Sequence, residues 1–191
     1  MKVGLFFGSF NPIHIGHLAI ANYMLEFTDL SEIWLVVSPQ NPFKSKTKLV
    51  NENERLRMVE LAVEADYKIK PTDIEFRLPK PSYTIDTLTY LAEKYPAKEF
   101  VLIIGSDNLE FFHKWKNYEI ILNNYSLYVY PRPGHGLGNY ENHKNVKPVN
   151  APRIEISSSF IREAVKEGKD IRFFLSKPVY DYITQMHFYE K

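Results

Sequence analysis

The chain has 191 residues, a length that allows one domain with a substantial hydrophobic core. Its 24 basic and 23 acidic residues give a formal net charge of +1, so no global field draws it toward nucleic acid or a membrane, and any anion binding must be local. Cysteine is absent, which excludes disulfides, thiolate metal sites and cysteine nucleophiles. The longest apolar runs are strand-sized and too short to span a bilayer. We therefore expect a cytoplasmic protein that has neither nucleic acid nor a membrane as its partner.

The first half of the chain alternates short apolar runs with amphipathic stretches. In chain order, the pattern predicts a strand at 3–7, a helix at 15–27, a strand at 33–37, a loop at 38–50, a helix at 51–65, a strand-like segment at 69–76 and a helix at 84–95. The helix at 51–65 has the clearest signals, because Asn51 can cap its start and Glu54 follows three residues later.

The second half continues this alternation. It predicts strands at 100–104 and 127–130, a long surface loop at 131–148, a short strand at 153–156 and helices at 159–166 and 178–186. Fully apolar strands that alternate with helices predict an α/β fold, a Rossmann-like parallel sheet with helices on both faces, in a single domain over residues 1–191. Ligands of such sheets bind beyond the carboxyl ends of the strands, so we expect the loops after residues 7, 37, 104 and 156 to share one cleft.

The loop after the first predicted strand has the residues of an anion site. Gly8 and Ser9 are small enough for backbone amides to approach a phosphate, and the next helix is expected to begin near residue 12 or 13, where its dipole favours an anion. His14 and His17 lie three residues apart and share a helix face. Two histidines alone fit a structural role equally well. The strand, the small loop and the helix start together favour a phosphate site.

A second candidate anion site lies at residues 156–162, where the sequence reads Ile-Ser-Ser-Ser-Phe-Ile-Arg. Its hydroxyls and the amides of the helix start can hold phosphate oxygens, and Arg162 near the start of that helix can grip them. Alone, this segment is explained better by an ordinary serine cap followed by a surface arginine.

Both segments resemble known signatures. The run Gly8-x-Phe10-Asn11-Pro12-x-His14-x-Gly16-His17 resembles the first signature of the nucleotidyltransferase superfamily, and residues 156–162 resemble the second, with Ser159 in place of threonine. The four letters at 14–17 also spell a motif of class I aminoacyl-tRNA synthetases. Over nearly the whole chain, most clearly at residues 38–44, 82–88, 104–115 and 132–134, the sequence is similar to bacterial nicotinate-nucleotide adenylyltransferases.

This resemblance implies transfer of the adenylyl group of ATP to nicotinate mononucleotide, which yields nicotinate adenine dinucleotide and pyrophosphate in NAD biosynthesis. The implied catalytic residues are His14, His17 and Arg162. The implied ATP-binding residues are Gly8, Ser9, Phe10, His14, Gly16, His17, Gly105, Asp107, Ile156, Ser157, Ser158 and Arg162. The implied substrate-binding residues are Asn11, Lys44, Tyr83, Thr84, Trp115 and Arg132.

The chemistry of these side chains suits that substrate. Trp115 and Tyr83 can stack on the flat nicotinate ring, the start of the helix at Thr84 can donate to its carboxylate, and Lys44 can neutralise the mononucleotide phosphate. Asp107 can bind ribose or an ion-bound water. Plainer roles exist as well: Trp115 as a core residue, Lys44 as a solvated loop cation and Asp107 as a helix cap.

The remaining expectations concern the metal, the assembly and the alternatives. We expect Mg²⁺ to be carried mainly by the ATP phosphates, without a protein metal site, because no carboxylate cage is evident. A homo-oligomer is compatible with the sequence. The alternatives are an adenylyltransferase for nicotinamide mononucleotide or phosphopantetheine, and a non-catalytic nucleotide-binding module. A synthetase fragment is disfavoured, because the chain has no Lys-Met-Ser-Lys-Ser run and no room for a tRNA-binding domain.

Overall fold

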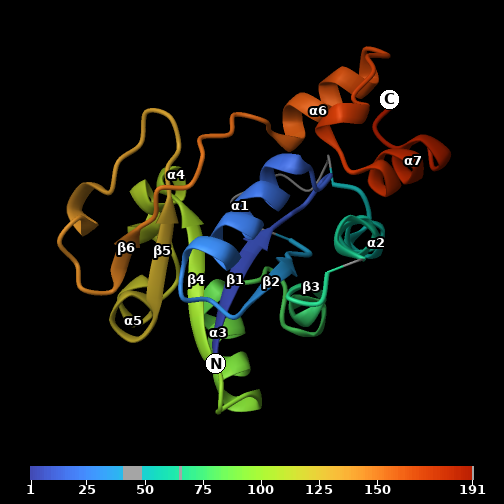
Figure 1. The fold of residues 1–191 in the computed structure, drawn as a ribbon. Coiled ribbons are helices and arrows are strands. Elements are labelled where there is room, and N and C mark those ends of the chain that lie inside the picture. The colour runs from blue at the N-terminus through green and yellow to red at the C-terminus, as the bar shows by residue number, and fades with distance from the viewer. Residues whose placement is uncertain (41–48, 65, 191) are drawn as a thin grey trace.

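The computed structural model describes residues 1–40, 49–64 and 66–190, and these contain a six-stranded sheet in the order β3-β2-β1-β4-β5-β6. All neighbouring strands are parallel (Figure 1). The strands are β1 (Lys2–Gly8), β2 (Glu32–Val37), β3 (Ile69–Thr72), β4 (Glu99–Gly105), β5 (Ser126–Tyr130) and β6 (Val146–Pro148). This parallel sheet confirms the predicted Rossmann-like fold class. Its order reverses direction between β1 and β4, which is where sheets of this kind bind ligands.

Helices cover both faces of the sheet. The α-helices are α1 (Ile15–Phe27), α2 (Glu52–Val63), α3 (Thr84–Lys94), α4 (Ser106–Glu110), α5 (Tyr118–Asn124), α6 (Ser158–Lys166) and α7 (Lys177–Gln185). Short 3₁₀ helices lie at η2 (Ile74–Arg77), η3 (Phe112–Lys114), η4 (Gly138–Tyr140) and η5 (Arg172–Phe174).

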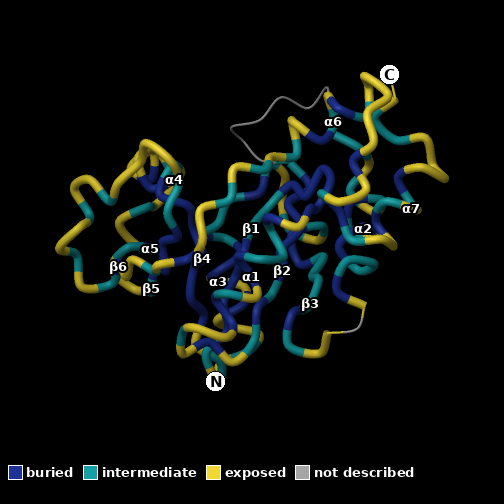
Figure 2. The backbone as a smooth tube through the Cα atoms, turned by 45° about the horizontal axis from the view of Figure 1, so that its top comes forward, coloured by how far each residue is buried: buried dark blue, intermediate teal, exposed yellow. Residues whose placement is uncertain are grey.

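The sheet separates two hydrophobic cores, and the alternation of side chains along each strand supplies both. Phe6 and Ile103 pack with α1, α2, α6 and α7 on one face, whereas Leu5 and Leu102 pack with α3 and α5 on the other. Figure 2 shows the central strands in the colour of buried residues, with exposed backbone concentrated in the peripheral loops. Because β1 and β4 are covered on both sides, their carboxyl ends are rigid supports for the loops that follow them.

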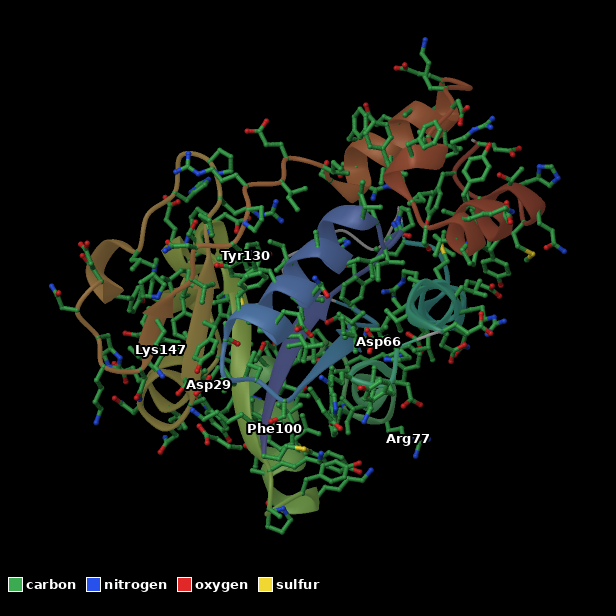
Figure 3. The ribbon with its side chains drawn as sticks, viewed as in Figure 1. Asp29, Asp66, Arg77, Phe100, Tyr130 and Lys147 are labelled. Carbon is green, nitrogen blue, oxygen red and sulfur yellow. The ribbon has the colours of Figure 1, made fainter. Side chains whose placement is uncertain are left out.

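All six carboxyl ends lie at one edge of the sheet. In Figure 3, Phe100 near the start of β4 lies low, whereas Tyr130 at the end of β5 lies high, so the strands run upward toward α6. Helix α4 follows β4 directly at this edge, and the start of α6 lies above β1 in Figure 1. The residues predicted to bind nucleotides therefore gather on the side where the fold places ligands.

Two predictions about the strands are wrong. Residues 153–156 do not form a strand, although their exposed and partly buried residues alternate as strand residues do. The sixth strand is β6, which lies inside the predicted loop at 131–148 and pairs with β5. Only Val146 of its three residues is buried, so this edge strand has too short an apolar pattern to recognise in the sequence.

Several smaller differences have a common cause, because elements of one or two turns have little periodicity. Helices α4 and α5, with 5 and 7 residues, were not predicted. The strand-like segment at 69–76 is a strand only to Thr72, after which η2 begins. The longer helices agree with their predicted ranges, and α1 has the bounds that its apolar periodicity predicts. Among the described residues, no helix is both long and apolar enough to cross a membrane.

Candidate active site

The loop after β1 turns sharply toward the start of α1. Phe10 has a φ of 45°, in the left-handed region, and its buried ring lies against Gly8. A Cβ atom on Gly8 would stand 2.8 Å from Phe10 Cζ, so only glycine fits there. Helix α1 begins at Ile15, later than residue 12 or 13, and His14 is its N-cap rather than a residue of its first turn.

His14 and His17 face each other across the first turn of α1. Their rings are stacked, with centroids 3.8 Å apart and an interplanar angle of 30°. The backbone N–H of His14 donates to Nδ1 of His17 over 3.3 Å. Because Nδ1 accepts, a neutral His17 ring carries its proton on Nε2, where it is a donor. The pair is therefore oriented by the helix start itself.

His14 is buried, and its Nδ1 atom has no hydrogen-bond partner. Burial, and second the charge of Arg132, lower the pKa of His14 to about 4, so the ring is neutral near pH 7. Gly16 leaves the space that this ring occupies, since a Cβ atom there would lie 2.9 Å from His14 Nδ1. Gly16 itself is not among the residues that line the cavity described below.

The second signature is bonded directly to the first. Ser157 caps α6 by accepting from the Phe160 N–H at 3.1 Å, and the Ser158 hydroxyl donates to the Pro12 carbonyl at 2.9 Å. Arg162, the fifth residue of α6, donates from Nη1 to the Asn11 carbonyl at 2.8 Å. Residues separated by 146 and 151 positions thus join two helix starts. Both helix starts offer unpaired N–H groups and a positive dipole end to one site.

These helix starts border a cavity of about 930 Å³, a size that accommodates nucleotide-sized ligands. Sixteen of the predicted site residues line it: Gly8, Ser9, Phe10, Asn11, His14, His17, Tyr83, Thr84, Gly105, Asp107, Trp115, Arg132, Ile156, Ser157, Ser158 and Arg162. Lys44 lies outside the described residues. The loops after β1 and β4 and the segment after residue 156 all contribute, with Ser38 from the loop after β2, as expected for the shared cleft.

The charge of the cavity wall is basic although the chain as a whole is almost neutral. Among the described residues that line it, the lysines and arginines are Lys114, Lys116, Arg132 and Arg162, and the carboxylates are Glu75 and Asp107. Arg132 donates to the Ile154 carbonyl at 3.1 Å, and its Nε lies 3.9 Å from Asp107 Oδ1. This local excess of positive charge suits a polyphosphate and a second anionic substrate.

A second part of the cavity, separate from the two signatures, is built from the start of α3 and from η3. Tyr83 precedes the first residue of α3, Thr84, and its ring is covered by Lys116 Nζ at 4.8 Å. Lys116 also pairs with Asp86 at 2.9 Å. Trp115 is half-buried and packs on Phe112 with ring centroids 5.3 Å apart. Aromatic faces, a helix start and a cation are therefore gathered in this region.

Sequence reasoning missed a buried acid in the same wall. Glu75 of η2 is 1% exposed, and its Oε1 accepts from the Thr87 hydroxyl at 2.8 Å. Burial raises the pKa of Glu75, and the nearby polar side chains of Thr87, Ser38 and Ser82 lower it by less. Its other oxygen, Oε2, and the Ser82 hydroxyl have no partner of normal hydrogen-bond geometry. A lone glutamate in a strand-like segment gives no sequence signal for such a position.

Sequence reasoning also missed Arg55, although its position on the apolar face of α2 indicates a special role. It is spaced four and eight residues before Val59 and Val63, on the apolar face, where a charge is unexpected. The fully buried guanidinium donates to the carbonyls of Ser9 (2.6 Å), Ser38 (2.8 Å) and Pro39 (3.0 Å), and its Nε donates to Val50 (2.9 Å). It therefore ties the loops after β1 and β2 together beneath the cavity.

The side chain of Asn11, predicted to bind substrate, is engaged by the protein itself. Its Oδ1 accepts from the Val50 N–H at 3.2 Å and from the Tyr189 hydroxyl at 2.9 Å. For metals, no cluster of three or more histidine, aspartate or glutamate side chains in the described residues could hold an ion.

Comparison with known proteins agrees with this arrangement. The model of the cytidylyltransferase-like family matches residues 5–164. A probable nicotinate-nucleotide adenylyltransferase from Cytophaga hutchinsonii is 57% identical over 99% of this chain and 98% of its own. Another from Flavobacterium johnsoniae is 54% identical over the whole of both chains.

Solved structures show the same fold. The nicotinic acid mononucleotide adenylyltransferase of Plasmodium falciparum complexed with NaAD has a TM-score of 0.85 at 22% identity, covering 99% of this chain and 97% of that chain. A putative nicotinate-nucleotide adenylyltransferase of Vibrio parahaemolyticus has a TM-score of 0.73 at 20% identity, covering 100% and 96%. With two signatures joined at one cavity and full-length relatives above half identity, this chain belongs to the cytidylyltransferase-like family and, within it, to the nicotinate-nucleotide adenylyltransferases.

Proposed function

We propose that this protein transfers the adenylyl group of ATP to nicotinate mononucleotide, forming nicotinate adenine dinucleotide and pyrophosphate in NAD biosynthesis. The observation that carries this proposal is the junction of the two helix starts, where Arg162 and Ser158 of α6 are hydrogen-bonded to the loop that holds His14 and His17. The full-length relatives are described as probable nicotinate-nucleotide adenylyltransferases, which supports the same substrate.

The reaction is an in-line displacement at the α-phosphorus of ATP. A phosphate oxygen of the mononucleotide forms a bond to that phosphorus, the bond from the phosphorus to the α,β-bridging oxygen breaks, and that oxygen leaves with pyrophosphate. No covalent enzyme intermediate is needed. The contribution of the protein is to position both nucleotides and to stabilise the charge that moves to the leaving group.

The phosphate-binding roles follow from the donors at each helix start. His17, protonated on Nε2, donates to the oxygens around the reacting phosphorus. His14 is neutral without ligand, because burial and Arg132 lower its pKa. A phosphate anion beside it favours the imidazolium and restores its charge. Arg162 and the amides at the start of α6 hold the departing β- and γ-phosphates.

Magnesium fits this donor set as an ion carried by the substrate. Mg²⁺ in nucleotide sites is usually bound through one or two carboxylates together with phosphate oxygens and water. Asp107, a partly exposed carboxylate of the cavity wall, would hold one of its waters. When bound, the ion supplies neutralisation of phosphate charge.

The acceptor binds in the region of Tyr83, Thr84 and Trp115. The nicotinate ring stacks on an aromatic face, and its carboxylate accepts from the N–H groups and hydroxyl at the start of α3. Lys116, which covers Tyr83 at 4.8 Å, adds a cation near the acceptor. An amide in place of this carboxylate loses the charge, so nicotinamide mononucleotide is the poorer acceptor.

Product analysis tests this assignment directly. Purified protein with ATP and Mg²⁺ is given nicotinate mononucleotide, nicotinamide mononucleotide or phosphopantetheine in parallel reactions, and the dinucleotide or dephospho-coenzyme product and pyrophosphate are quantified. We expect kcat/KM to be at least about 10-fold higher for nicotinate mononucleotide than for the other acceptors, because loss of one hydrogen bond to a charged group lowers binding by about that factor. A preference for either other acceptor would refute the substrate, and no product with any acceptor would favour a non-catalytic nucleotide-binding module.

A further inference from the structure

The residues after α7 fold back toward the site instead of extending away from it. The Met186 N–H donates to Tyr182 at 3.0 Å, and the Phe188 N–H donates to Ile183 at 3.1 Å. His187 and Tyr189 have φ angles of 55° and 68°, in the left-handed region. That conformation is unfavourable for a residue with a side chain, so the tight reversal is held by the contacts that it makes possible.

The main contact of this segment is with the first signature. The Tyr189 hydroxyl donates to Asn11 Oδ1 at 2.9 Å, over a sequence separation of 178 residues. Asn11 is 3% exposed and lies three residues before His14. Its backbone carbonyl accepts the 2.8 Å hydrogen bond from Arg162 Nη1. One asparagine therefore links the reversed segment to the arginine that is placed on the ATP phosphates.

Tyr189 also lies in the electrostatic field of two arginines. Burial raises the pKa of its phenol well above the ordinary value, while the charges of Arg162 and Arg55 lower it by less. The net direction keeps the hydroxyl protonated at neutral pH, so it acts as a donor to Asn11 throughout the working range. Arg55 is the buried arginine that ties together the loops after β1 and β2, so Tyr189 interacts electrostatically both with it and with the phosphate-binding Arg162.

We propose that Tyr189 is a positioning residue for adenylyl transfer, which acts through Asn11 to fix the backbone carbonyl that orients Arg162. The inference rests on the proposed function, because its first readout is turnover. Without this bond, Asn11 retains its bond from the Val50 N–H, but the turn that carries its carbonyl has one restraint fewer. Arg162 then samples more orientations, and small misplacements of a phosphate-binding group lower turnover strongly.

The chain offers a matched control in Tyr182. This tyrosine of α7 donates its hydroxyl to Glu54 of α2, away from both signatures. Tyr189→Phe and Tyr182→Phe each remove one hydroxyl and keep the ring, so the comparison reports what each hydroxyl holds. We expect Tyr189→Phe to lower kcat about 10-fold with little change in the KM of the acceptor, and Tyr182→Phe to keep parental kcat. Melting temperatures are measured for both, and turnover is compared well below the lower one.

The same substitution made in an Asn11→Ala variant gives a test that does not depend on folding stability. In Asn11→Ala the acceptor of the bond is gone, so adding Tyr189→Phe should lower kcat no further. The proposal is overturned if Tyr189→Phe has parental kcat, if Tyr182→Phe lowers kcat equally, or if the loss persists in the Asn11→Ala background. Should the parent itself form no product, the proposed function fails. The positioning role is then decided by the rise in melting temperature with ATP, which should be smaller for Tyr189→Phe than for Tyr182→Phe, while equal rises would overturn it.

Discussion

The two halves of the cavity are held in different ways. The phosphate half, which consists of residues 8–17 and 156–162, is bonded across 146 and 151 positions of sequence by Ser158 and Arg162. The acceptor half, which consists of Glu75, residues 82–87 and residues 114–116, is joined over 12 positions by Thr87 and over 30 by Lys116. The phosphate-binding residues therefore come together only when the whole chain has folded. The residues that select the acceptor lie in segments closer in sequence, with partly exposed aromatic rings.

Removal of His17 should have the largest effect on activity. His17→Ala deletes a donor from the reacting phosphate and is expected to lower kcat about 10²- to 10³-fold under saturating substrates, as for loss of one oxyanion donor. His113→Ala, which removes an exposed imidazole from η3, is the control and should keep parental turnover. If His17→Ala stays folded and retains kcat within a few-fold of the parent, the role given to the phosphate half is wrong.

Removal of Arg55 should mainly lower stability. Arg55→Met keeps the length of the side chain but deletes four hydrogen bonds to buried carbonyls, and we expect a loss of about 3 kcal/mol in the free energy of unfolding. Arg57→Met on the same helix, with a side chain 52% exposed, should change it by less than about 0.5 kcal/mol. Urea unfolding measures both. Equal small losses would show that Arg55 does not hold the two loops.

His14 should make the ligand-free protein less stable in mild acid. Its folded pKa of about 4 lies below the ordinary histidine value of 6.5, so the unfolded chain binds the proton first. The contribution of His14 to the free energy of unfolding is fully present above pH 6.5 and falls as the pH drops toward 4. The loss at about pH 5 is about 2 kcal/mol. Urea unfolding of the parent and His14→Asn at about pH 7.5 and pH 5 measures it. The variant should lose less stability than the parent, and equal losses would contradict the buried neutral ring.

The acceptor half should respond separately to Trp115. Trp115→Ala removes a stacking face and is expected to raise the KM for nicotinate mononucleotide about 10-fold, corresponding to 1 to 2 kcal/mol of ring stacking. The KM for ATP should change little, because the phosphate half is intact. Trp115→Phe, which restores an aromatic face, should recover most of the loss. Steady-state kinetics with each substrate varied in turn decides this, and an equal rise in both KM values would show that Trp115 acts through packing on Phe112.

The sequence alone predicted the parallel sheet and the long helices, because apolar runs and helical periodicity report burial directly. It also predicted that Gly8–His17 and residues 156–162 would meet, through their resemblance to known signatures and the rule for carboxyl ends. The prediction of a strand at 153–156 was wrong. Alternating burial arises wherever an extended segment lies against a surface, whether or not it is hydrogen-bonded to a neighbouring strand.

The residues that sequence reasoning missed act through contacts distant in sequence. Tyr189 reaches Asn11 only after the chain reverses beyond α7, and Glu75 faces the cavity only because η2 follows β3. Arg55 alone had a local signal, a charge at an apolar helix position. Gly16, expected to contact ATP, also leaves room for the ring of His14, a role that only side-chain geometry reveals.

The separation of chemistry from acceptor choice is tested most directly by one ratio, kcat/KM for nicotinate mononucleotide divided by kcat/KM for nicotinamide mononucleotide. It is measured in the parent, in Thr84→Val and in Arg162→Gln. We predict that Thr84→Val lowers the ratio about 10-fold, because it removes a hydroxyl donor to the carboxylate. Arg162→Gln should lower both kcat/KM values strongly and leave their ratio within about two-fold of the parent. A ratio that changes in Arg162→Gln and not in Thr84→Val would contradict the division of the cavity into these two halves.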